Sequence, residues 1–139
     1  MYTLKQFPED FIVKEISNVK IKDQGKYYYY LLKKRNRNTL DVIKELAKQL
    51  GIKERLIGFA GSKDKHALTE QVISIPNKVR EVKIDNVELK YLGKGDQPIS
   101  LGDLKGNQFE IIVRNTTKTP QKITFVENYF DEQRFSKNN

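Results

Sequence analysis

The stretch NTLDVIKELAKQLG, residues 38–51, carries the clearest secondary-structure pattern in this chain of 139 residues. Asn38 or Thr39 can cap a first helical turn, and Gly51 is typical of the residue that follows a last turn. The pattern therefore predicts a helix over residues 40–50 that buries one face. The apolar residues that form this face recur at helical spacing: Leu40, Ile43, Leu46, Ala47 and Leu50.

Segments on both sides of this helix have compositions typical of strands. Residues 11–17 are β-rich, and residues 26–33 contain four consecutive tyrosines. We expect these two segments to pair as a hairpin with a long loop. Further strands are expected at 71–75, at 82–93 as two strands joined by a turn at 85–86, and at 107–114.

The order of these elements predicts the fold class. Pro120 follows Thr119, and a proline at the first helical position predicts a short helical stretch there. The resulting order β-β-α-β-β-β-β-α predicts an α+β fold, a mainly antiparallel mixed sheet with helices on one face. The length favours a single domain over residues 1–139.

Composition excludes several classes of protein. The chain has no cysteine, which excludes disulfides and thiolate metal sites, and His66 is its one histidine, so we expect no metal site. No apolar run is long enough for a membrane span, and the first residues do not resemble a secretory leader, so we expect a cytoplasmic protein without a membrane partner. The formal net charge of +8 favours a nucleic-acid partner, the alternative being a basic surface that only aids solubility.

The stretch GFAGSKDKHALTEQ, residues 58–71, places one acid between two lysines. It is not a phosphate-binding loop, because that motif requires Gly-Lys-Ser/Thr. Lys63 and Lys65 favour the ionised form of Asp64, and an ionised carboxylate in a glycine-opened loop is a candidate nucleophile. The alternative is a turn aspartate in a solvated run of charges. His66, without a visible partner, is interpreted as structural.

Two other groups of residues suit RNA. Lys33, Lys34, Arg35 and Arg37 follow the four tyrosines, and cations beside aromatic rings can meet phosphates and unstacked bases. Alternate tyrosines can equally pack in the core, with the basic cluster on the surface. Near the end of the chain, Asn107 can bond a base edge or its own backbone, and Phe109 can stack on a base.

Taken together, five segments resemble one family, the TruD-type tRNA pseudouridine synthases. The first is Pro8-Glu-Asp-Phe-Ile-Val, with Lys5 just before it, and the second is Asn38-Thr39. The third, residues 59–71, is similar to the family's signature. The last two are residues 101–109, with Gly-Asn-x-Phe, and residues 128–135. The segments occur in the family's order along nearly the whole chain.

The resemblance implies an activity, the isomerisation of uridine to pseudouridine in tRNA, at uridine 13, without a metal or organic cofactor. It implies that Asp64 is catalytic and that Asn107 and Phe109 orient and stack the target base. It also implies active-site roles for Phe11 and for Lys5, the cationic partner of the acid. The cations expected to meet the RNA backbone are Lys33, Lys34, Arg35, Arg37, Lys63 and Lys65.

The chain also departs from the family's pattern. Asp131 and Ser136 replace glycines, and Glu127 replaces a proline. Family members continue well beyond Asn139 with the rest of the sheet and an inserted second domain. We therefore expect residues 1–139 to form the amino-terminal portion of the catalytic domain, without that second domain.

Several alternatives remain open from the sequence. The chain can be a fragment, one half of a split synthase, or a reduced protein that forms a homo-oligomer or pairs with a complementing chain. It can also be a non-catalytic RNA-binding remnant of the fold, or a small basic protein associated with RNA or the ribosome. Retention of Asp64, Lys5, Asn107 and Phe109 together favours the synthase.

Overall fold

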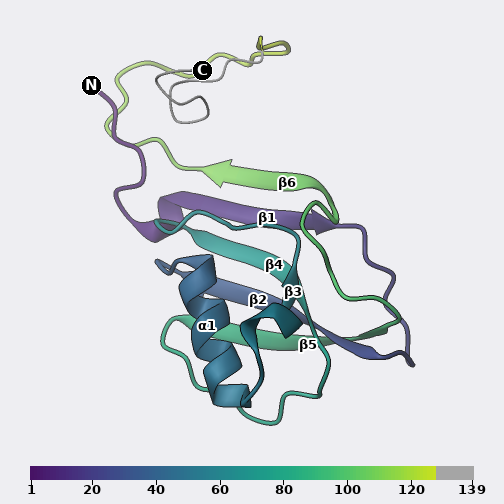
Figure 1. Ribbon diagram of the computed structural model, residues 1–139. Coiled ribbons are helices and arrows are strands. Elements are labelled where there is room, and N and C mark those ends of the chain that lie inside the picture. The colour runs from purple at the N-terminus through teal and green to yellow at the C-terminus, as the bar shows by residue number, and fades with distance from the viewer. Residues whose placement is uncertain (128–139) are drawn as a thin grey trace, which may run out of the picture.

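The computed structural model describes residues 1–127, which form a mixed sheet and one α-helix (Figure 1). The long strands are β1 (Phe11–Ser17), β2 (Tyr27–Arg35), β4 (Leu68–Ile75), β5 (Val87–Gly95) and β6 (Leu104–Ile111). The other elements are α1 (Thr39–Leu50), the two-residue strand β3 (Gly58–Phe59) and 3-10 turns at Pro8–Asp10 and Glu54–Leu56.

The strands lie in the order β5-β2-β4-β1-β6, with β3 paired to β4. The β1–β4 pair is parallel and the other pairs are antiparallel. The predicted α+β class with a mainly antiparallel mixed sheet is therefore confirmed. The predicted hairpin of the first two strands is wrong, because β4 lies between β1 and β2 (Figure 1).

The helix forms where the sequence predicts it. The Asn38 side chain accepts hydrogen bonds from the N–H groups of Leu40 and Asp41 at 2.9 and 3.4 Å, and this caps the first turn. Gly51 ends the helix in the left-handed region at φ +65°. One face of α1 is buried, but Leu40, which the spacing placed on that face, is 57% exposed.

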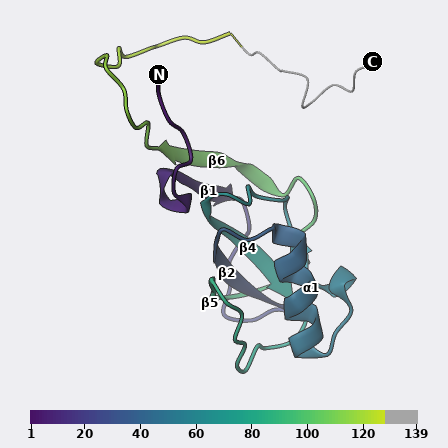
Figure 2. The ribbon, with the colours of Figure 1, turned by 90° about the vertical axis from the view of Figure 1, so that its left-hand side faces the viewer.

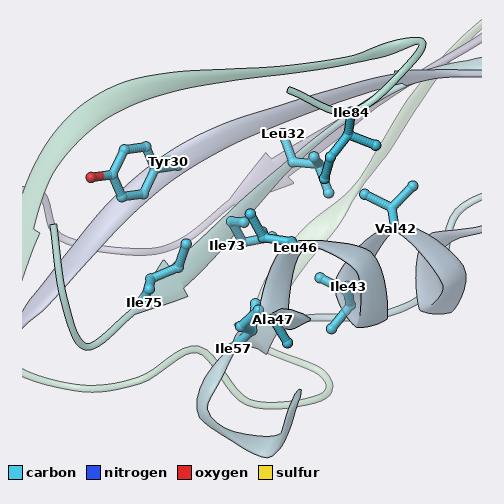
Figure 3. Packing of buried hydrophobic residues seen from close by; sticks show 10 residues of the cluster. All are labelled: Tyr30, Leu32, Val42, Ile43, Leu46, Ala47, Ile57, Ile73, Ile75 and Ile84. Carbon is cyan, nitrogen blue, oxygen red and sulfur yellow. The ribbon is translucent and has the colours of Figure 1, made fainter. Parts of the chain in front are cut away.

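The main core lies between α1 and one face of the sheet, which we call the helix face (Figures 2 and 3). The sheet contributes Tyr30, Leu32, Ile73 and Ile75, and the loop before β5 contributes Ile84. Burying these side chains excludes water from a continuous apolar layer. The buried residues of α1 in this core are Val42, Ile43, Leu46 and Ala47.

Strand register determines which functional side chains share the helix face. Paired residues in neighbouring strands point to the same side of a sheet, and sides alternate along each strand. On β2, Leu32 pairs with Gln71 of β4, and Lys34, which lies two residues after Leu32, pairs with Thr69. Thr69 also pairs with Val13 of β1. Val13 pairs with Phe109. The helix face therefore carries, beyond the core, Lys34, Phe11, Glu15, Asn107 and Phe109.

The other local predictions have mixed outcomes. The strand expected at 71–75 is the end of the longer β4, and the turn at 85–86 precedes β5, but residues 82–84 form no strand. The helical stretch expected after Pro120 is wrong for residues 120–127, which contain no helix. The motif at 128–135 lies outside the described residues. Within residues 1–127, no helix has the length and apolar character to cross a membrane.

Candidate active site

Asp64 lies in an irregular loop, residues 60–67, between β3 and β4; we call it the Asp64 loop. Its side chain is 45% exposed, and Oδ1 lies 3.2 Å from Nζ of Lys5. Lys5 lies in the segment that precedes the 3-10 turn Pro8–Asp10, and its backbone is in the left-handed region, at φ +53°. A half-exposed carboxylate is thus held beside one cation and remains open to a ligand.

Two aromatic rings continue this cluster. Nζ of Lys5 lies 3.8 Å from the centroid of the Phe11 ring, within cation–π range. Phe11 meets Phe109 edge to face, with ring centroids 5.9 Å apart. Phe109 is 54% exposed, although a large apolar ring is normally buried. Acid, cation and rings from three segments of the chain therefore lie in one contiguous group, the Asp64 cluster: Lys5, Phe11, Asp64 and Phe109.

Asn107 lies at the edge of this group. It pairs with Glu15 in the β1–β6 register and stands two residues before Phe109 on the same face of the sheet. Its side chain is exposed. The structure thus brings Asn107 to the same surface as the Asp64 cluster.

An ion pair that the sequence interpretation missed fixes the segment carrying Lys5. Asp10 is 1% exposed and accepts two hydrogen bonds from the Arg114 guanidinium, at 2.8 and 2.9 Å. These bonds hold the pKa of the Asp10 carboxyl below its usual value. The backbones of Thr3 and Arg114 also exchange two bonds of 2.9 Å. Asp10 belongs to the Pro8-Glu-Asp segment that resembles the family's first motif, but nothing in the sequence indicated that it pairs with Arg114.

Two cations expected to meet RNA are instead buried beneath the Asp64 loop. Lys63 forms a buried ion pair, with Nζ 2.8 Å from Oε2 of Glu15 and side chains 4% and 1% exposed. Lys34 is 1% exposed, and its Nζ donates to the carbonyl oxygens of Asp64 and Lys63 at 2.7 and 3.3 Å. We therefore reassign Lys34 and Lys63 from the RNA surface to the support of the loop.

Thr39, Gln71 and Glu15 also support this loop, a role that the sequence patterns did not assign to them. The Thr39 hydroxyl accepts a hydrogen bond from the N–H of Lys63 at 3.0 Å and donates one to the carbonyl oxygen of Lys63 at 3.3 Å. Gln71 Nε2 donates to the carbonyl of Gly61 at 2.9 Å. Glu15 Oε1 accepts from the N–H of Val72 at 3.2 Å, between the stretches of β4 that pair with β1 and β3. Polar residues at strand positions facing the core were the available signal.

The other expected RNA cations lie at the surface, mostly in ion pairs. Nζ of Lys33 lies 3.2 Å from Glu70, and Arg35 pairs with Glu9. Arg37 pairs with Glu45 at 2.7 Å and donates to the carbonyl of Asp85. Lys65 is exposed next to Asp64 and forms no ion pair within residues 1–127. Of the six cations, it is therefore the one most available to a phosphate beside the Asp64 cluster.

The arrangement suits a planar ligand with a sugar attached. The exposed Phe109 ring offers a stacking surface, and the Asp64 carboxylate belongs to the same cluster through Lys5 and Phe11, where it can act on a neighbouring atom of the ligand. His66, two residues from Asp64, has Nδ1 3.0 Å from Oδ1 of Asn36, so this ring does have a structural partner. Residues 1–127 contain no group of three or more His, Asp or Glu placed to hold a metal ion.

Comparison with known proteins places these residues in a family. A family model described as tRNA pseudouridine synthase D (TruD) matches residues 2–139. The chain is 42% identical over 149 residues to tRNA pseudouridine synthase D of Aquifex aeolicus, an alignment that covers 95% of this chain and 39% of the relative. It is 47% identical over 142 residues to a protein of Pyrococcus furiosus described as "Probable tRNA pseudouridine synthase D", covering 95% of this chain and 35% of that one.

A solved structure agrees with the sequence comparison. The crystal structure of a TruD protein from Methanosarcina mazei matches with a TM-score of 0.77 at 42% sequence identity. The match covers 81% of this chain and 26% of that chain. The chain thus spans well under half the length of the proteins it matches, and it belongs to the tRNA pseudouridine synthase D (TruD) family.

Proposed function

We propose that this protein isomerises uridine to pseudouridine in tRNA, with Asp64 as the catalytic carboxylate. The observation that carries the proposal is the convergence of Lys5, Phe11, Asp64 and Phe109 from separate segments onto one open surface. A purely structural aspartate has no need of a neighbouring stacking surface. The names of the relatives supply the reaction and the substrate class.

The reaction exchanges one bond of the base for another. The bond from N1 of uracil to the ribose carbon breaks, and a bond from C5 to the same carbon forms. The hydrogen that C5 carried ends as N1–H, so no atom is gained or lost and no second substrate is required. Asp64, half exposed beside Lys5, is the group that meets the ribose while the base turns.

The neighbours of Asp64 position the base and the acid. Lys5 orients the carboxylate through the 3.2 Å contact, and Phe11 keeps Lys5 in place beneath it. Phe109 stacks on the target base and offsets part of the cost of removing that base from the RNA stack. Asn107, on the same face, bonds the edge of the base.

The protein surface supplies long-range attraction. With a formal net charge of +8, it attracts the phosphate backbone, and Lys65 lies closest in sequence to the catalytic acid among the expected RNA cations that remain exposed. We propose uridine 13 of tRNA as the position modified, tRNA as the partner and the cytoplasm as the compartment.

Incubating the full-length protein with a tRNA transcript and mapping pseudouridine tests the proposal. Asp64→Asn keeps the size of the side chain and removes its charge, so pseudouridine formation should fall by on the order of 10³-fold or more while tRNA affinity stays nearly unchanged. Asp23→Asn, at an exposed aspartate outside the Asp64 cluster, is the matched control and should keep full activity.

Two outcomes would contradict the proposal in different ways. If Asp64→Asn forms pseudouridine as fast as the unchanged protein, Asp64 is not the catalytic acid. If the unchanged protein binds tRNA but forms no pseudouridine, the protein is a binding module of the family's fold. Mapping a uridine other than 13 would overturn only the position.

A further inference from the structure

Lys34 is a buried lysine whose ammonium bonds main-chain oxygens. It lies on β2 between Thr69 of β4 and Val87 of β5, and it is 1% exposed. Within the described part of the chain it forms no ion pair with a carboxylate. Burial lowers the pKa of its ammonium to about 8. An ammonium in such a position costs free energy that a leucine or methionine would avoid, so its hydrogen bonds need an explanation.

Those hydrogen bonds go to two consecutive carbonyl groups of the Asp64 loop. Nζ of Lys34 donates to the carbonyl oxygen of Asp64 at 2.7 Å and to that of Lys63 at 3.3 Å. The two carbonyls belong to the peptide units immediately before and after the Cα atom of Asp64. Because each peptide unit is planar, holding both units fixes φ and ψ of Asp64, and thus the direction of its Cα–Cβ bond.

We infer that Lys34 is a positioning residue for Asp64: its buried ammonium holds the two peptide units that aim the carboxylate at Lys5. The role rests on the proposed function of Asp64, which is the group that meets the substrate. Lys34 itself reaches neither the surface nor the substrate. Other groups secure the same loop, since Thr39 holds the N–H of Lys63 and Glu15 holds its ammonium.

The second peptide unit distinguishes Lys34 from these other supports. Thr39 and Glu15 act on Lys63, and Gln71 acts on Gly61. Among residues 1–127, Lys34 is the group that bonds the carbonyl oxygen of Asp64. Its loss would leave that oxygen buried without a donor, and the peptide unit would turn toward water. The Asp64 side chain would then lose its fixed direction.

Lys34→Met in the full-length protein tests the inference, because methionine fills similar space and donates no hydrogen bond. We expect kcat for pseudouridine formation to fall by about 10²-fold, the cost typical of a 1 Å misplacement, with KM and tRNA affinity nearly unchanged. Lys90→Met, which removes an exposed lysine of β5, is the matched control for charge and should change neither quantity.

A second measurement does not depend on activity. Amide hydrogen exchange at residues 63–65 should quicken in Lys34→Met while β2 and β4 keep their protection. In the unchanged protein, NMR should show the Lys34 ammonium coupled through hydrogen bonds to the carbonyl carbons of Lys63 and Asp64. This reading remains informative even if the variant does not fold.

The outcomes separate the two proposals. Unchanged exchange at residues 63–65 together with unchanged kcat overturns the role of Lys34 and leaves the function standing. An inactive unchanged protein overturns the function, while the exchange and coupling data still decide whether Lys34 holds the loop. A fall in tRNA affinity and in its salt dependence, with kcat intact, would instead make Lys34 an RNA contact.

Discussion

Lys33 and Lys34 are neighbours on β2, yet they lie in regions of opposite character. Lys33 is on the far side of the sheet, 37% exposed, with its Nζ 3.2 Å from Glu70. Lys34 is buried on the helix face beneath the Asp64 loop and bonds main-chain oxygens. Alternation along a strand separates the two. The comparison teaches that the basic residues expected to meet RNA form two sets, a buried set that supports the loop and a surface set whose members are mostly in ion pairs.

Breaking the buried set should have the largest effect on stability. Lys63→Met leaves the Glu15 carboxylate buried without its cation, and the free energy of unfolding should fall by about 3–5 kcal/mol. Urea denaturation of the variant measures this. The double variant Lys63→Met/Glu15→Gln removes both charges and should recover much of the loss. A loss below about 1 kcal/mol in the single variant would place the pair with surface ion pairs.

The pH dependence of stability sharpens the contrast at Lys34. Burial lowers the pKa of Lys34 to about 8 from an ordinary value of 10.5. Between these values the unfolded chain holds a proton that the folded protein has released. The free energy of unfolding should therefore rise with pH over this window, by at most about 1.4 kcal/mol per pH unit. Below about pH 8 the contribution of Lys34 to the free energy of unfolding should no longer change with pH, because both states then hold the proton.

Denaturation of the unchanged protein and of Lys34→Met at several pH values from 7 to 10 isolates this contribution, because the other titrating groups are shared. The difference between the two proteins should shift in favour of the unchanged one as pH rises through about 8. Curves that stay parallel would show that Lys34 titrates alike in the folded and unfolded states.

The surface set should matter less. Lys33→Ala removes an ion pair whose partners are 37% and 25% exposed, so the free energy of unfolding should change by about 0–1 kcal/mol. Increasing the salt concentration should shrink even this difference, because exposed charges are screened. A loss as large as that of Lys63→Met would abolish the distinction between the two sets.

Lys65→Ala should change stability least, within about 0.5 kcal/mol, because the side chain is exposed and forms no ion pair within residues 1–127. Its effect should appear in RNA binding. The slope of log affinity for tRNA against log salt concentration should fall by about 1, as expected for one lost phosphate contact. An unchanged slope would remove Lys65 from the RNA surface.

The local elements were largely predictable from sequence, and their pairing was not. Helical spacing, the Asn38 cap and Gly51 were sufficient for α1, because each acts within a few residues. The hairpin expected for the first two strands failed because β4, which follows α1 in the chain, inserts between them. Strand propensity carries no information on which distant strand is the neighbour.

The site was predictable only through the resemblance. Lys5, Phe11, Asp64 and Phe109 do meet, but no spacing in the sequence places residue 5 beside residue 64. The burial of Lys34 and Lys63 was not expected, since a lysine in a basic run normally faces water. It depends on register: Lys34 lies opposite Thr69, under the loop, and its neighbour Lys33 lies opposite Glu70.

Two strands that pair in the sheet, β1 and β6, are synthesised far apart in time. Phe11 lies on β1, the first strand of residues 1–127, whereas its partner Phe109 lies on β6, the last strand of that described range. At about 5–20 residues per second, synthesis of the roughly one hundred intervening residues takes on the order of 5–20 s. For that time the edge of β1 that pairs with β6 lacks that partner, so the Asp64 cluster lacks Phe109 until β6 has been made.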